Sequence, residues 1–178
     1  MKNRPLKNLV LAAMFLAVGM VLPFLTAQIE SFGESLLPLH LPVLLCGLIC
    51  GWKYGAAVGL TLPLLRSLCF ARPRLYPDAL VMAVELFAYG LIIGLLYARF
   101  RKKNLWAVYG SLIPAMIGGR ILWGVAKTVF LGLQGTPFTL TAFWVSGFTK
   151  ALPGIVLQLI LIPSVMAIVQ KINAPKKQ

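Results

Sequence analysis

The chain has 178 residues, of which 60% are hydrophobic and 12% are charged, and its formal net charge at pH 7 is +13. A soluble domain carries about a quarter charged residues, so this composition excludes a water-soluble globular protein. The cations lie in short clusters between long apolar stretches, which indicates membrane topology rather than a nucleic-acid-binding face. We therefore predict an all-α integral membrane protein that forms one transmembrane domain over residues 1–178 and binds no nucleic acid.

Six apolar runs are long enough to cross a bilayer as helices, because a hydrocarbon core about 30 Å thick needs roughly 20 helical residues per crossing. The first run follows three cations, as a secretory signal does, but it is longer than the apolar core of a signal, and we interpret it as a retained helix. Only a turn at residues 51–54 separates the short second and third runs, so five spans are an alternative. The runs cover residues 9–29, 36–52, 54–70, 77–98, 105–131 and 139–170.

Lysine and arginine are unevenly divided between the loops of this six-helix arrangement. The side opposite to the N-terminus holds only Arg72 and Arg74, beside acidic residues. The side of the N-terminus holds Lys2, Arg4, Lys7, Lys53, Arg99, Arg101, Lys102, Lys103, Lys171, Lys176 and Lys177. Because short cytoplasmic loops are enriched in lysine and arginine, we predict that both termini lie in the cytoplasm.

Glycines recur every four residues across the second and third runs. They are Gly47, Gly51, Gly55 and Gly59. Small residues at this spacing let membrane helices approach closely, so we predict a tight helix contact here.

Five ionisable side chains fall within the apolar runs, where a charge costs a few kcal/mol. They are Arg66, Glu85, Arg120, Lys127 and Lys150, and all lie at a similar depth in the outer half of the predicted membrane domain. Two interpretations are open. The five side chains line a polar cavity that opens to the outside, or Glu85 pairs with one cation while the others reach the outer head groups and nothing binds.

Helical spacing places further side chains beside these charges. Three stripes result, consisting of Arg120, Trp123 and Lys127, of Asp78, Glu85 and Tyr89, and of Ser146 and Lys150. If the stripes converge, four cations face one buried carboxylate, and an anionic or carboxylate-bearing ligand would balance the charge. His40, the one histidine, lies at the outer start of the second run and is either a packing residue or a ligand contact.

Sequence motifs for catalysis are missing. There is no phosphate-binding Gly-Lys-Ser/Thr loop, no His-Glu-x-x-His, no nucleophile elbow and no carboxylate pair spaced for a metal. The cysteines Cys46, Cys50 and Cys69 have no histidine or carboxylate close enough to complete a metal set, so we interpret them as packing residues. We predict a protein that is not an enzyme, has no cofactor or metal, and takes any transport energy from a partner. An intramembrane enzyme would need more than Glu85.

Several stretches resemble the substrate-binding (S) components of energy-coupling factor (ECF) vitamin transporters. They are Leu-Leu-Pro-Leu-His-Leu-Pro-Val at residues 36–43, the glycines from 47 to 59, Pro63, Leu-Tyr-Pro at 75–77 and Glu-Leu-Phe-Ala-Tyr-Gly at 85–90. The resemblance is to the branch that includes pantothenate and hydroxymethylpyrimidine carriers, and its motifs lie within residues 33–97.

The resemblance implies a six-helix subunit of the bacterial cell membrane that binds a vitamin near its outer side and works with a transmembrane coupling (T) subunit and two ABC ATPases. It implies that the loops at 31–37 and 72–77 close over the ligand. The family's usual docking face, Ala-x-x-x-Ala on the first helix, matches Ala13 and Ala17.

The intramembrane cations bear on which vitamin is bound. They fit cationic thiamine poorly and a carboxylate better, so pantothenate is the first expectation. Neutral hydroxymethylpyrimidine, folate, a deazapurine precursor and a membrane scaffold without a ligand are alternatives.

Overall fold

The computed structural model describes residues 4–26, 37–135, 139–149 and 151–173, and these segments are helical apart from short connections. The described part contains no strand, which confirms the all-α class. Its elements are α1 (Arg4–Thr26), α3 (His40–Cys50), α4 (Trp52–Phe70), η1 (Leu75–Ala79), α5 (Leu80–Arg99), α6 (Leu105–Gly132), α7 (Leu140–Trp144), η2 (Val145–Thr149) and α8 (Leu152–Asn173).

Four of the described helical segments are long and apolar enough to cross a membrane. They are Pro5–Phe24, Leu75–Arg99, Leu105–Gly132 and Leu152–Ile172. α3 is apolar but has only 11 residues, and α4 has 19 residues that include Lys53 and Arg66. The chain is therefore a multi-pass helical protein, while the count of six spans and the cytoplasmic side of the termini stay predictions.

The range predicted as a single last span, 139–170, contains three elements. α7 and η2 come first, and α8 begins after them at Leu152. Pro153 lies in the first turn of α8, where a missing backbone N–H is tolerated because it would have no acceptor within the helix. The proline therefore marks the start of a new helix, and Ser146 precedes α8 instead of lying within it.

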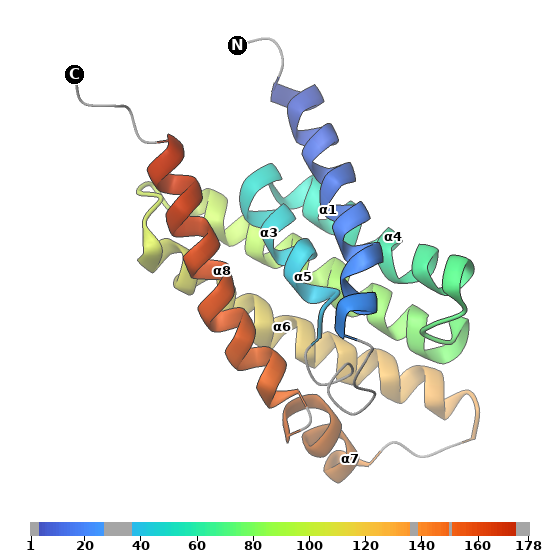
Figure 1. Cartoon of the computed structure of the whole chain (residues 1–178). Coiled ribbons are helices and arrows are strands. Elements are labelled where there is room, and N and C mark those ends of the chain that lie inside the picture. Colours follow the sequence, from blue (N-terminus) through green and yellow to red (C-terminus); the bar gives the residue numbers. More distant parts are fainter. Residues whose placement is uncertain (1–3, 27–36, 136–138, 150, 174–178) are drawn as a thin grey trace, which may run out of the picture.

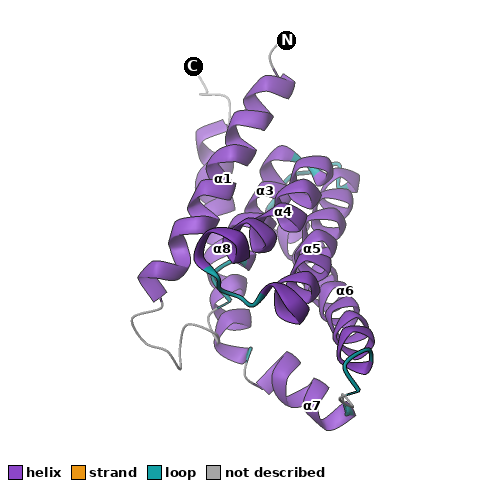
Figure 2. Ribbon diagram, turned by 90° about the vertical axis from the view of Figure 1, so that its right-hand side faces the viewer, coloured by secondary structure: helices purple, strands orange, loops and turns teal. Residues whose placement is uncertain are grey.

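The helices pack around a centre formed by α4, α5 and α6 (Figure 1). α3 contacts both α4 and α5, α1 packs against α3 and α4, and α8 packs against α6 and α3. The first turn of α1 and the last turn of α8 lie at one end of the bundle, and α7 lies at the other end (Figures 1 and 2).

Glycines bring α3, α4 and α5 into backbone contact. A Cβ atom on Gly90 would lie 2.2 Å from the carbonyl carbon of Gly55, and one on Gly59 would lie 2.2 Å from the carbonyl oxygen of Leu86. The predicted tight contact is thereby confirmed at Gly55 and Gly59. Gly51 differs, because it has open space around it and a φ of +94° at the turn between α3 and α4, a conformation that favours glycine.

Replacing Gly90 by alanine is expected to lower the thermal stability of the protein clearly. The added methyl group meets backbone atoms rather than a movable side chain, and such overpacking typically costs about 1–3 kcal/mol. Gly132→Ala at the end of α6 is the matched control, since nothing lies within 4 Å of the added atom there. Equal melting temperatures of the two variants in detergent would contradict the close helix contact.

Candidate functional site

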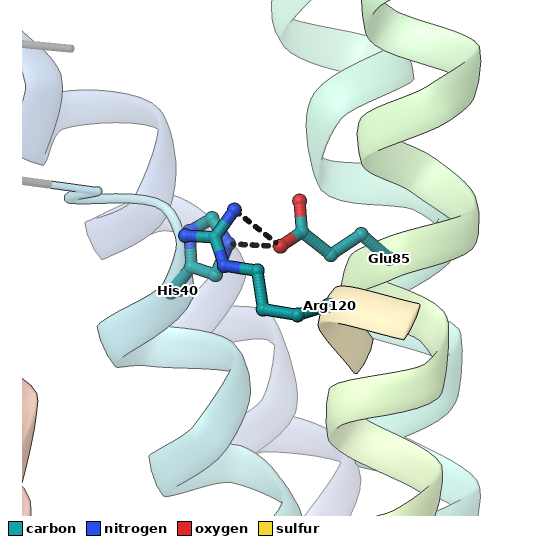
Figure 3. A network of polar contacts seen from close by, with 3 residues as sticks. All are labelled: His40, Glu85 and Arg120. Carbon is teal, nitrogen blue, oxygen red and sulfur yellow. Dashed lines mark ion pairs between the residues drawn. The ribbon is translucent and has the colours of Figure 1, made fainter. Parts of the chain in front are cut away.

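Three helices each contribute one buried polar side chain to a common cluster (Figure 3). His40 opens α3, Glu85 lies on α5 and Arg120 lies on α6, and only 1%, 1% and 4% of these residues is exposed. The Glu85 Oε1 atom lies 3.0 Å from Arg120 Nη1 and 3.3 Å from His40 Nε2. A buried charge is tolerated when it is paired, so Glu85 and Arg120 compensate each other within the membrane domain.

Tyr89 extends this cluster along the same face of α5. It lies one helical turn after Glu85 and is fully buried. Its ring packs edge-on against the His40 ring, with 5.1 Å between the centroids. Gly119 on α6 makes room for Tyr89, because a Cβ atom there would lie 2.7 Å from the ring. The glycine thus lets α6 bring Arg120 close to Glu85.

A second group of side chains leads from the buried cluster towards the exposed end of α6. The Arg120 guanidinium lies 5.8 Å from the centre of the Trp123 ring, and Lys127 Nζ lies 5.2 Å from the same ring. Lys127 in turn lies 4.0 Å from Asp78 in η1, where the two side chains are 26% and 44% exposed. The stripe predicted from helical spacing on α6 therefore forms one polar and aromatic track.

Arg66 lies elsewhere, between α1 and α4. Its Nη1 donates a 2.7 Å hydrogen bond to the backbone carbonyl of Met20. Its guanidinium also lies 5.0 Å from the Phe24 ring and 5.5 Å from the Phe70 ring. These contacts give Arg66 a role in joining α1 to α4, apart from the Glu85 cluster.

Two further predicted site residues lie near the start of α8 in the chain. Ser146 belongs to η2 and is half-buried. The next residue, Gly147, approaches Trp123, since a Cβ atom on it would lie 3.3 Å from that ring. The chain next to Ser146 thus approaches Trp123, whereas Lys150 lies outside the described residues, as does most of the predicted loop at 31–37.

The expectation of four cations against one carboxylate does not hold for the described side chains. Arg120 is paired with Glu85, and Lys127 is paired with Asp78. Arg66 bonds a carbonyl between two aromatic rings. The sequence-based count overlooked that Asp78 is close enough to Lys127 to offset its charge, so the described cluster is close to charge balance.

The cluster contains hydrogen-bonding atoms that have no partner among the described residues. Arg120 Nε and Nη2 and His40 Nδ1 are buried and have no hydrogen-bond partner in the described protein. A buried donor without a partner loses about 1–3 kcal/mol of solvation, so a bound molecule with acceptor atoms would be favoured here. No group of three metal-binding side chains occurs among the described residues.

The sequence-based prediction missed a buried amide whose polar atoms have no partner among the described residues. Gln158 on α8 is 1% exposed, and neither its amide nitrogen nor its amide oxygen has a hydrogen-bond partner among the described residues. The available signal was an uncharged amide in the apolar first half of α8, which a search for ionisable residues passes over.

Several apolar helices with a buried polar cluster between them define a multi-pass membrane protein. A family model described as "ECF transporter, substrate-specific component" matches residues 7–166. The chain therefore belongs to the substrate-specific components of ECF transporters. These are transport subunits rather than enzymes, and the family implies a small-molecule substrate and a module of T subunit and ATPases. Comparison with curated proteins and with solved structures finds no match.

Proposed function

We propose that this subunit binds a small vitamin or vitamin precursor with a carboxylate, pantothenate being the first candidate, and delivers it across the bacterial cell membrane with a T subunit and two ABC ATPases. The observation that carries the proposal is the set of polar contacts that the Arg120 guanidinium makes and leaves unmade. Glu85 holds Nη1, while the buried Nε and Nη2 atoms have no hydrogen-bond partner among the described residues. These two atoms form the edge of a guanidinium that binds a carboxylate with two parallel hydrogen bonds.

The neighbours of Arg120 favour the binding of a ligand carboxylate. Glu85 restrains the guanidinium through its 3.0 Å contact with Nη1, and His40 Nε2 lies 3.3 Å from the same Glu85 oxygen. Trp123 offers an apolar ring next to the guanidinium. A ligand carboxylate at the free edge would therefore meet a donor pair that is already oriented, which lowers the entropic cost of binding.

Hydroxymethylpyrimidine is the second candidate, and the charge balance of the cluster favours it. Because Glu85 already neutralises Arg120, a neutral ligand leaves no charge uncompensated. The Glu85 carboxylate would accept a hydrogen bond from the amino group of the pyrimidine, and the rings of Tyr89 and Trp123 would pack against it.

A thermal-shift screen with two matched arginine variants tests the proposal. Arg120→Lys keeps a positive charge opposite Glu85 but removes the free guanidinium edge, and Arg66→Lys makes the same exchange at a buried arginine between α1 and α4. Ligand at 100 times its Kd stabilises the folded state by about 2.7 kcal/mol. We expect pantothenate to raise the melting temperature of the wild type and of Arg66→Lys, with most of this rise lost in Arg120→Lys.

The other outcomes of the screen separate the alternatives. A shift with hydroxymethylpyrimidine but not with pantothenate would move the assignment to the neutral ligand. A shift that is equal in both variants would remove Arg120 from the site. No shift with any B-vitamin or precursor would favour a membrane scaffold without a ligand.

The same proposal assigns the docking of the T subunit to the face of α1 that carries Ala13 and Ala17. Both residues are exposed, whereas the adjacent Ala12 is buried against the rest of the bundle. Small side chains on a lipid-facing helix allow the backbone of a partner helix to come close. Met14 and Val18 are also exposed beside them, so a partner helix would bury apolar side chains next to the alanines.

A further inference from the structure

The buried polar atoms without partners single out Gln158. In the part of the chain that the structure describes, such side-chain atoms belong to four residues. Three of them, His40, Glu85 and Arg120, form the cluster described above, and the fourth is Gln158 on α8. Gln158 is as deeply buried as His40 and Glu85.

α8, which carries Gln158, packs against two of the helices that form the cluster. α8 contacts α3 and α6, the helices that carry His40 and Arg120. An apolar cavity of about 190 Å³ is lined by Pro42 of α3 and Ile162 of α8, among other residues, which aligns these two helices. Both helices run in the same direction (Figure 1). Gln158 lies one turn before Ile162, and His40 lies two residues before Pro42, so both polar side chains lie at a similar level of the bundle.

The residues next to Gln158 on its own helix are apolar. The neighbouring residues Ile155, Leu159 and Ile162 belong to, or pack against, the hydrophobic core. A buried primary amide needs both acceptors and a donor to offset its loss of hydration. A leucine would fill the same place without that loss, so the amide suits a molecule that enters the site and brings hydrogen-bonding groups with it.

We propose that Gln158 is a further ligand contact, which recognises a neutral group that offers both a hydrogen-bond donor and an acceptor. This inference rests on the proposed ligand-binding function and narrows the substrate class. An amide, as in pantothenate, and an aminopyrimidine edge, as in hydroxymethylpyrimidine, both have this chemistry. The ligand then extends from the α5–α6 cluster to α8, and a simple carboxylic acid without such a group binds poorly.

Equilibrium binding of pantothenate and of hydroxymethylpyrimidine to Gln158→Leu tests the contact. The probe that binds the wild type is expected to bind Gln158→Leu about tenfold more weakly, which corresponds to about 1.4 kcal/mol. Gln170→Leu is the matched control on the same helix, where Gln170 Nε2 lies 3.4 Å from the Tyr97 hydroxyl at the other end of α8. Its Kd is expected to equal that of the wild type.

The stability of the ligand-free protein gives a second readout. If the amide serves the ligand, Gln158→Leu melts at or above the temperature of the wild type, because leucine needs no hydrogen bonds. A lower melting temperature would show that Gln158 bonds within the fold, and an unchanged Kd in Gln158→Leu would overturn the contact while leaving the binding function intact. If no vitamin or precursor of the thermal-shift screen binds the wild type, the proposed function fails and this inference falls with it.

Discussion

Replacing Glu85 by leucine is expected to lower the free energy of unfolding by about 3–5 kcal/mol, the usual effect of removing one partner of a buried ion pair. The variant leaves the Arg120 guanidinium buried and without its carboxylate, and His40 adds no negative charge that would replace it. Thermal melting in detergent, supported by unfolding in mixed micelles, measures the loss.

The double variant Glu85→Leu with Arg120→Met is the control for this prediction. It removes both charges and leaves apolar side chains of similar size, a change that is often neutral or stabilising at buried ion pairs. We expect it to recover most of the stability that Glu85→Leu loses, while the ligand-induced thermal shift is absent because the Arg120 guanidinium has been removed. If Glu85→Leu is as stable as the wild type, the two side chains do not form a compensating pair.

Replacing Ala17 by tryptophan is expected to block assembly with the T subunit and to abolish uptake. A large ring at the proposed contact keeps the partner helix at a distance, and membrane helix association depends on close packing of small residues. Because Ala17 is exposed, the folded subunit itself has room for the ring. Co-purification with the T subunit and the ATPases, together with uptake by cells that express all components, measures the effect.

The ligand-induced thermal shift must survive in Ala17→Trp, because the substitution lies on the surface of α1 and leaves the buried cluster intact. Ile121→Trp is the matched control, since Ile121 is an exposed residue on α6 outside the proposed docking face. Normal uptake by Ala17→Trp would exclude this face, and loss of uptake by Ile121→Trp as well would indicate a general effect of the ring on membrane insertion.

Helical spacing predicted the contacts within single helices well. Arg120, Trp123 and Lys127 form the expected stripe on α6, and Gly55 and Gly59 make the expected close contacts. These features depend on the fixed geometry of a helix and on side-chain size, which are properties of the local sequence. Hydropathy likewise placed most helices, although it merged α7, η2 and α8 into one range.

Local sequence patterns did not predict which residues contact the intramembrane charges. Arg66 bonds the carbonyl of Met20, which is 46 positions away in the chain, and depth in the membrane alone had grouped Arg66 with Glu85. Gln158 carries no charge, so the cost of ions in lipid gave no reason to select it. In each case the deciding factor was which helix faces which other helix.

The amino-acid sequence by itself determined that this protein is a helical membrane protein. The free energy of transferring apolar side chains and charges into a bilayer depends on the composition and order of the residues, which the sequence contains. The missing catalytic motifs were also visible in the sequence. Its family motifs also predicted the substrate-specific components of ECF transporters. Only the tertiary structure decided that His40 joins Glu85 and Arg120, that Asp78 offsets Lys127, and that Arg66 lies apart. These pairings depend on the packing of helices that are distant in the chain, and hydrogen bonds and ion pairs act only between atoms that this packing brings within about 3–4 Å.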